Sequence, residues 1–214
     1  MNQDTTTSLF QYWNRLRNGR PAPRRAEIEP SDIKTLLADT FILERDATER
    51  PIFRLAGTRL CAAFGRELKA YGFASLWCEK DRRLAARMAE SAFSRKSVAV
   101  MTFSGFSEAG RSQDFEMLLL PLDGGRESPR VLGSAAPVEP AFWLGADPIC
   151  EARMQSVRVL DPEREPLLLG NRPSIPVTPS LDPLADSGSS YRPFGAGRRI
   201  RHLVVYDGGL DGGN

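Results

Sequence analysis

Histidine and cysteine, the side chains that commonly supply nucleophiles, bases and metal ligands, are scarce in this chain of 214 residues. His202 is the only histidine, and the three cysteines, Cys61, Cys78 and Cys150, stand far apart in mostly apolar surroundings. A zinc ribbon or a histidine-rich metal site therefore lacks ligands to draw on. An odd number of widely spaced cysteines is typical of free thiols in a reducing compartment, so we expect three buried thiols and neither a disulfide nor a metal site.

The motifs of the familiar enzyme classes do not occur in the sequence. There is no G-x-S-x-G elbow, no Cys/His pair with a plausible base, no phosphate-cradling glycine motif and no kinase signature. Asp114 and Glu116 occupy alternate positions of a predicted strand, so they share one face. We expect both carboxylates to face solvent. The Asp-Gly-Gly repeats at Asp207 and Asp211 lack the further oxygen ligands of a calcium loop. We therefore predict that the protein is not an enzyme; a polar cluster inside a cavity would reopen the question.

A basic segment, QYWNRLRNGRPAPRR (11–25), contains five arginines and no acid. Its arginines either pair with nearby acids such as Glu27, Glu29 and Asp32, which makes the segment a structural linker, or they bind an anion or a partner protein. Nucleic acid is disfavoured because the run is short, interrupted by proline and not interleaved with aromatic side chains.

The chain length, the net charge and the distribution of apolar residues limit the remaining classes of function. The length suits one domain with a solid core and a substantial appendage. The formal net charge of +2 excludes a globally positive surface. The N-terminus lacks the basic and apolar regions of a signal peptide, and no stretch of about eighteen apolar residues occurs. We expect a cytoplasmic protein that contacts neither a membrane nor nucleic acid.

Hydrophobic periodicity predicts helices and strands in an α+β order. The first helix presents Leu9, Tyr12, Trp13 and Leu16 on one side, and a second presents Ile33, Leu36 and Leu37. The remaining elements follow in this order: strands over 40–45 and 52–57, helices over 58–65 and 81–95, and strands over 97–106, 113–122 and 130–137.

The pattern weakens after Pro137. We divide the chain into an N-terminal helix and basic linker (1–25), a main domain (26–140), a partly ordered extension with a short edge strand from Val157 (141–170) and a tail (171–214). The tail is rich in Pro, Gly and Ser and is predicted to be flexible. Its strand over 202–206 would dock on a sheet edge or on a partner.

Several motifs occur in one order at matched spacing: YWNRLRNGRPAPRRAEIEPSDIKTLL, FILE, FRLAGTRLCAAFGREL, SLW and DRRLAARM. Together they resemble a bacterial PAS domain family, common in alphaproteobacteria and formerly described as a domain of unknown function. The resemblance covers roughly Leu9 to Pro137. It implies the PAS fold, a five-stranded antiparallel sheet with helices on one face, here preceded by an N-terminal amphipathic helix.

PAS domains commonly bind a cofactor or metabolite between sheet and helices. Haem would need a histidine on the long helix, and a photoreceptor flavin would need an Asn-Cys-Arg-type motif; neither occurs, so the cofactor stays unidentified. The side chains expected to line the pocket are apolar, and the same residues at the same spacings would equally fill a core. They are Phe41, Phe53, Leu55, Leu60, Phe64, Trp77, Met88, Met101, Phe103 and Met117.

The resemblance implies a stand-alone sensory or adaptor protein in bacterial signal transduction that binds a small molecule or a partner without catalysis. The expected partners are a second copy and a signalling protein such as a histidine kinase or regulator. The interface would be the helix face of Leu9, Tyr12, Trp13 and Leu16, unless that face packs back on its own sheet. The alternative function is a purely structural interaction module whose core is plugged and holds no ligand.

Overall fold

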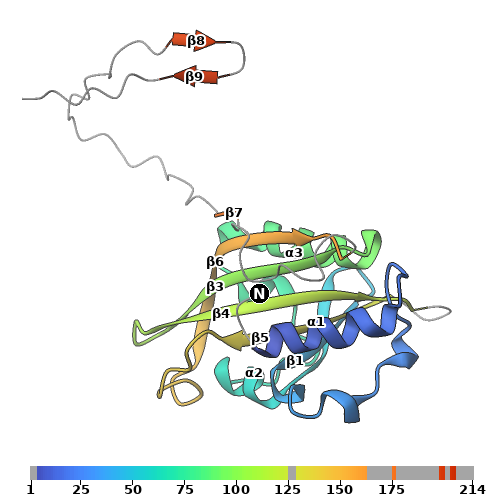
Figure 1. Cartoon of the computed structure of the whole chain (residues 1–214). Coiled ribbons are helices and arrows are strands. Elements are labelled where there is room, and N and C mark those ends of the chain that lie inside the picture. The colour runs from blue at the N-terminus through green and yellow to red at the C-terminus, as the bar shows by residue number, and fades with distance from the viewer. Residues whose placement is uncertain (1–3, 125–128, 163–174, 177–197, 201–202, 206–214) are drawn as a thin grey trace, which may run out of the picture. The chain divides into compact units, whose positions relative to one another are not determined.

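An antiparallel sheet organises the first of the two units into which the chain divides, Met1–Pro179 and Ser180–Asn214. The computed structural model describes residues 4–124, 129–162, 175–176, 198–200 and 203–205. Within these residues the sheet has seven strands in the order β2-β1-β5-β4-β3-β6-β7 (Figure 1). The strands are β1 (Thr40–Arg45), β2 (Pro51–Ala56), β3 (Val98–Ser107), β4 (Ser112–Leu122), β5 (Arg130–Pro137), β6 (Ile149–Leu160) and β7 (Ile175–Pro176).

The five strands predicted from the sequence, β1 to β5, lie side by side in the sheet. The sheet continues beyond them, because β6 pairs with β3 along nearly its whole length. The sequence indicated only a short edge strand from Val157, whereas β6 begins at Ile149. The β3–β6 pairing shifts register at Cys150 and Gln155, and burial does not alternate strictly at either end of β6, so the strand lacks a continuous alternating signal.

Helices cover both faces of the sheet, and Figure 1 shows α1 crossing one face with α3 behind the other. The helices are α1 (Asp4–Arg17), α2 (Thr58–Ala63) and α3 (Glu79–Arg95), with short 3-10 turns η1 (Arg25–Glu27), η2 (Pro30–Ile33), η3 (Leu37–Asp39) and η4 (Phe73–Leu76). The expected helix presenting Ile33, Leu36 and Leu37 is two such turns, because Pro30 opens the first turn and the chain enters β1 directly after the second.

Alternation along the central strand β4 builds two separate cores. Phe115, Met117 and Leu119 face α2, η4 and α3, whereas Leu118 and Leu120 face α1. One face of β4 was expected to be exposed to solvent, but α1 covers it. Glu116, which was expected in solvent, is only 3% exposed, while Asp114 is exposed as predicted.

The α1 face consists of side chains buried against the sheet. Leu9 and Trp13 are fully buried, Tyr12 is nearly so and Leu16 packs at the border of the same core. Trp13 Nε1 also donates a hydrogen bond of 2.7 Å to the carbonyl oxygen of Pro121. The prediction that this face of α1 is a partner interface is thus wrong. The stated alternative, that α1 packs on the sheet of its own chain, holds because β3, β4 and β5 are apolar on both faces.

Two glycines allow close packing in the first unit. A Cβ on Gly57 would lie 2.2 Å from the carbonyl oxygen of Leu37, so the corner between β2 and α2 requires glycine. Gly133 lies opposite Phe41 on the neighbouring strand, and a Cβ there would lie 2.2 Å from the Phe41 ring. The ring thus occupies the space that the glycine leaves.

The second unit contains an antiparallel pair of short strands, β8 (Arg198–Ile200) and β9 (Leu203–Val205). The strand β9 falls within the range 202–206 predicted from the sequence. The tail was predicted to be flexible, and this prediction concerns residues that the structure does not describe. The Asp-Gly-Gly repeats at Asp207 and Asp211 also lie outside the described residues.

Candidate functional site

The side chains expected to line a ligand pocket pack together inside the first unit. Of the ten, eight are buried in the core between the sheet and α2, η4 and α3, and Met88 packs against that core while partly exposed. The buried members are Phe41, Phe53, Leu60, Phe64, Trp77, Met101, Phe103 and Met117.

Aromatic rings run through this core in continuous contact. Phe103 and Phe115 stack with centroids 5.0 Å apart, and the Trp77 ring meets Phe103 edge to face at 5.1 Å. Phe73 continues the series from Trp77 toward Phe53, with centroid distances of 6.0 and 5.8 Å. The space in which a PAS ligand was expected is therefore occupied by these side chains.

Leu55 is the exception among the ten predicted residues. It was placed on the same face of its strand as Phe53, but it is 50% exposed while Phe53 is fully buried. The β1–β2 pairing passes from Ile42 opposite Leu55 to Leu43 opposite Phe53, so Arg54 forms a β-bulge. One extra residue reverses the alternation, and Leu55 points away from the core.

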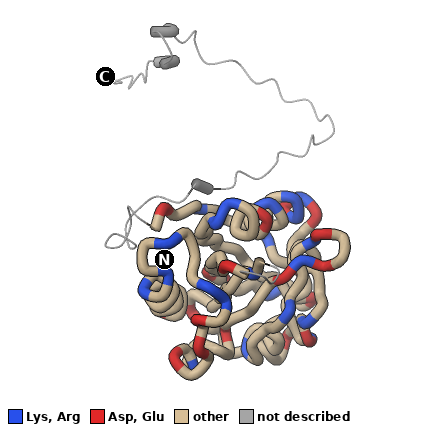
Figure 2. Tube along the Cα trace, turned by 90° about the vertical axis from the view of Figure 1, so that its right-hand side faces the viewer, with Lys and Arg blue, Asp and Glu red and all other residues tan. Residues whose placement is uncertain are grey.

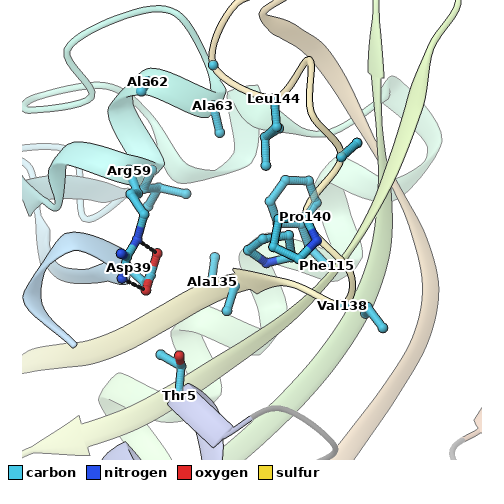
Figure 3. A pocket seen from close by; sticks show the side chains of 15 residues that line it. Thr5, Asp39, Arg59, Ala62, Ala63, Phe115, Ala135, Val138, Pro140 and Leu144 are labelled. Atoms are coloured by element: carbon cyan, nitrogen blue, oxygen red, sulfur yellow. Dashed lines mark hydrogen bonds and ion pairs between the residues drawn. The ribbon is translucent and has the colours of Figure 1, made fainter. Parts of the chain in front are cut away.

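A pocket of about 410 Å³ lies between α2, the end of β5 and the loop 138–145, and we call it the α2–β5 pocket (Figure 3). Leu60, Ala63 and Ala135 contribute to it from the core. Pro140 and Leu144 enclose it from the loop. Leu60 is the one predicted ligand residue in its lining. The others were missed because the pocket joins three distant segments, and one of them follows Pro137, where the sequence pattern weakens.

An ion pair forms the polar side of the α2–β5 pocket. Arg59 donates from Nε to Asp39 Oδ1 at 2.7 Å and from Nη2 to Asp39 Oδ2. The Asp39 side chain is 7% exposed and that of Arg59 is 63% exposed, so the arginine faces the pocket and solvent while the carboxylate is held below it. The hydrogen bonds to Asp39 raise the pKa of Arg59, against a smaller opposing effect of desolvation.

Hydrogen bonds fix the loop that closes the pocket. The Gln113 side chain donates from Nε2 to the Glu139 carbonyl at 2.9 Å and accepts from the Ala141 amide at Oε1 at 2.8 Å. Trp143 is buried, and its carbonyl accepts two amides of the following turn. Between these anchors Phe142 is 96% exposed.

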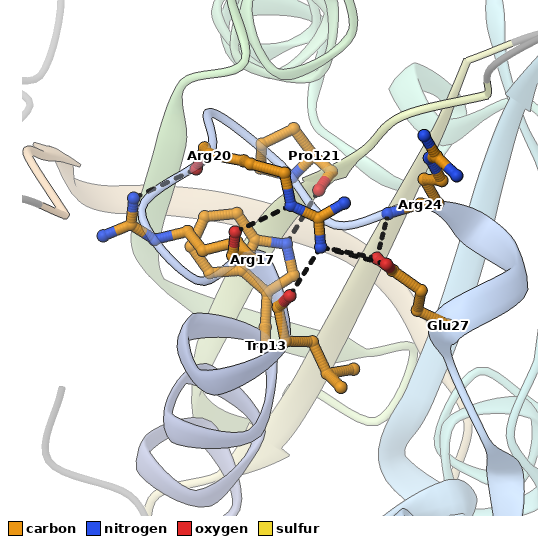
Figure 4. Close-up of polar contacts among 7 residues, drawn as sticks. Trp13, Arg17, Arg20, Arg24, Glu27 and Pro121 are labelled. Atoms are coloured by element: carbon orange, nitrogen blue, oxygen red, sulfur yellow. Dashed lines mark hydrogen bonds and ion pairs between the residues drawn. The ribbon is translucent and has the colours of Figure 1, made fainter.

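The basic segment is bound to its own surroundings (Figure 4). Arg20 donates from Nε to the Arg17 carbonyl at 2.9 Å and from Nη2 to Glu27 at 2.8 Å, and the Arg24 amide also donates to Glu27. The Arg20 hydrogen bond lowers the pKa of Glu27, and the Arg24 amide adds to this. The linker interpretation is supported at Glu27. Figure 2 shows basic and acidic residues interspersed over the described trace, not gathered on one side.

The three cysteines are free thiols with different exposures. Cys78 is buried, Cys61 is half-buried and Cys150 is exposed, so the expectation of three buried thiols is wrong for two of them. Cys150 is exposed because it lies at an irregularity of β6. Burial, followed by the hydrogen bond from Cys78 Sγ to Asp81, raises the pKa of Cys78. The raised pKa and the burial both disfavour the reactive thiolate of Cys78.

In the part of the chain that the structure describes, no three His, Cys, Asp or Glu side chains come together as metal ligands. Among its described helices, none has the length and apolar character needed to cross a bilayer.

Comparison with known proteins supplies the family. No curated protein matches the sequence. Among solved structures, a Light-Oxygen-Voltage domain studied with a flavin analogue is similar with a TM-score of 0.41 and 12% identity, covering 51% of this chain and 83% of that one. The PAS domain of a protein from Colwellia psychrerythraea gives a TM-score of 0.38 and 13% identity, covering 51% and 97% of the two chains. The family model described as PAS domain matches residues 1–136, more than half of the 214 residues. The chain therefore belongs to the PAS domain family.

Proposed function

We propose that this PAS domain is a sensory or adaptor module in signal transduction that works by binding, and that the α2–β5 pocket is its ligand site. The observation that carries the proposal is an open volume of about 410 Å³ beside a core that is otherwise filled by its own side chains. Small-molecule sites in proteins typically measure about 300–1,000 Å³ and are largely apolar, with a few placed polar groups. The α2–β5 pocket matches this description.

The lining defines the class of ligand. Alanine, proline and leucine side chains make up most of the wall, which favours an apolar molecule. Arg59 uses two of its five N–H donors on Asp39, so other donors are available to one acceptor group of the ligand. Because Asp39 neutralises Arg59, the pocket offers no excess charge to attract a strongly charged ligand.

The proposed role does not include catalysis. The carboxylate in the pocket, Asp39, accepts two hydrogen bonds from the Arg59 guanidinium, and its side chain is only 7% exposed. These contacts suit a fixed recognition element.

A second candidate function is a purely structural interaction module, with a second copy or a signalling protein such as a histidine kinase or regulator as its partner. The continuous contact of aromatic rings inside the first unit favours this candidate, because it leaves the interior plugged. In this case the α2–β5 pocket would receive a side chain of a partner protein.

Native mass spectrometry of the purified chain tests the first proposal. Ala62 lines the pocket from the exposed side of α2, so Ala62→Trp would fill the pocket without overpacking the core. Ala47 is an exposed alanine in the turn between β1 and β2, and Ala47→Trp is the matched control. We expect a retained small molecule in the wild type and in Ala47→Trp, and its loss in Ala62→Trp.

Absence of any bound molecule, combined with no thermal stabilisation by a library of small apolar compounds, would overturn the ligand proposal and leave the interaction module. A retained molecule that survives Ala62→Trp would show that ligand binding occurs elsewhere.

A further inference from the structure

Phe142 presents an aromatic ring to solvent at 96% exposure, next to a pocket that it does not fill. Val138, on the same loop and in the pocket lining, is 43% exposed. Single exposed apolar residues are ordinary, but an exposed aromatic ring beside an apolar hollow has the composition of a protein interface.

The backbone that carries Phe142 is held in place. Gln113 binds the main chain at Glu139 and Ala141, and the buried Trp143 follows directly. A ring on such a backbone is already positioned for binding, so little conformational entropy is lost when it is buried. This distinguishes Phe142 from a ring on a loosely held loop.

The neighbouring α2–β5 pocket has room for such a ring. An engineered cavity of about 150 Å³ lined by apolar side chains accepts benzene, and the pocket of about 410 Å³ is more than twice that size. Its own Phe142 does not occupy it, because that ring points into solvent.

We propose that Phe142 of one copy inserts into the α2–β5 pocket of a second copy, and that the second copy does the same in return. The ring and the pocket adjoin each other on one surface, since Ala141 lines the pocket and Phe142 is the next residue. A two-fold axis between them places each ring over the other copy's pocket, which is the self-complementarity that a symmetric dimer requires.

The charges around the ring and pocket favour a second copy over a strongly charged partner. Arg59 is neutralised by Asp39, Arg111 lies 3.8 Å from Asp147, and Glu139 on the loop is an exposed acid. Two such surfaces carry little excess charge, and they offer a highly acidic or basic partner little to pair with.

One consequence concerns regulation and rests on the proposed function. A small molecule in the α2–β5 pocket would occupy the place of the partner copy's ring, so ligand binding and dimer formation would exclude each other. The ligand would then act by shifting a monomer–dimer equilibrium.

Sedimentation velocity over a range of concentrations tests the dimer without any ligand. We expect the wild type to dimerise reversibly and Phe142→Ala to weaken association at least about a hundredfold, because two contacts are lost and each is expected to contribute about tenfold or more. Ala62→Trp blocks the pocket and should weaken association similarly. Val159→Ala removes another exposed apolar side chain on β6 and is the control, with no expected change.

A mixture of the two weakened variants gives the sharpest result. Phe142→Ala keeps its pocket and Ala62→Trp keeps its ring, so their heterodimer regains one of the two contacts. We expect it to associate about tenfold more tightly than either variant with itself. A monomeric wild type, a dimer that survives Phe142→Ala, or a mixture no tighter than its components would overturn the proposal. Because no ligand is present, a failed ligand proposal leaves these results unaffected.

Discussion

Replacing Trp13 by alanine tests whether α1 is part of the folded domain or a face for partners. Trp13 is fully buried between α1 and the sheet, and its indole N–H donates to the Pro121 carbonyl. Truncation of a buried tryptophan to alanine costs about 3–5 kcal/mol. We expect Trp13→Ala to lower the free energy of unfolding by that amount, which is a large part of the stability of about 5–15 kcal/mol typical of a domain.

The conservative variant Trp13→Phe separates packing from hydrogen bonding. It keeps most of the apolar contact but leaves the Pro121 carbonyl without its indole donor, at an expected cost of about 1–3 kcal/mol. In a domain of this size each kcal/mol lowers Tm by about 2–4 °C. Trp13→Ala is therefore expected to lower Tm by about 6–20 °C, several times more than an exposed substitution would.

Urea unfolding followed by far-UV circular dichroism measures both variants, because this signal does not depend on the tryptophan removed. Gln11 lies on the exposed side of the same helix, and Gln11→Ala is the control, with an expected change within about 0.5 kcal/mol. A cost below about 1 kcal/mol for Trp13→Ala would refute the packing of α1 on the sheet. The apolar face of α1 would then again be available to a partner.

Four further predictions test the core and the thiols. Phe53→Ala is expected to cost about 3–5 kcal/mol and Leu55→Ala less than about 1 kcal/mol in urea unfolding, because the bulge turns only Phe53 inward; equal costs would contradict the bulge. Gly133→Ala is expected to cost at least about 1–3 kcal/mol in the same assay, because its methyl group meets a buried ring, and an unchanged stability would contradict that contact. Burial raises the pKa of Cys78, so mass spectrometry of peptides labelled with iodoacetamide at neutral pH should show Cys150 reacting at least about tenfold faster. The raised pKa stabilises the fold below the unfolded thiol value of about 8.5, and this contribution is lost as pH rises through the folded value; Cys78→Ala should reduce that alkaline loss.

Local patterns in the sequence predicted β1 to β5 well because each of these strands carries its own signal. The ranges predicted for β1 and β5 agree with the structure, and the helix predicted over 81–95 lies within α3. In each case apolar side chains recur at the spacing of the element itself, and residues such as Gly57 mark where it begins or ends.

The second covered face of the sheet could not be inferred in the same way. The polar pair Asp114 and Glu116 on β4 suggested solvent, and the apolar face of α1 suggested a partner. Asp114 is indeed exposed, whereas Glu116 is buried, and the apolar face of α1 packs on the sheet. That packing joins residues far apart in the chain, since Trp13 and Pro121 lie 108 residues apart. A sequence pattern shows that a face is apolar, but it does not show which surface covers it.

The sequence did not predict the candidate site either, because the site also depends on features that leave no local pattern. Bulges at Arg54 and in β6 reverse the alternation without any marker residue, so Leu55 was assigned to the wrong side. The α2–β5 pocket depends on the path of the loop 138–145 across the end of the sheet. Its small apolar side chains, such as Ala62 and Ala135, are equally common in ordinary packing.

The edges of the sheet are also covered in the first unit, which bears on where a partner can bind. At the β6 edge, Asp81 at the start of α3 accepts a hydrogen bond of 2.8 Å from the Met154 amide, and β7 pairs with β6 a few residues further on. At the β2 edge, the Phe53 amide donates to the Tyr71 carbonyl at 2.9 Å. Backbone groups engaged in this way are not available to add a strand from another protein.

Helices cover both faces of the sheet and hydrogen bonds engage both edges, which leaves the end where β5 leads into the loop 138–145 to be considered. There the core side chains Leu60 and Ala135 reach an open pocket, and the exposed ring of Phe142 lies beside it. Binding at this end would change the packing of α2 against β5 directly, since both elements line the pocket. A signal received there would therefore reach the core through side chains already in contact with it, and the Phe142 and Ala62 variants would separate that effect from the stability of the fold.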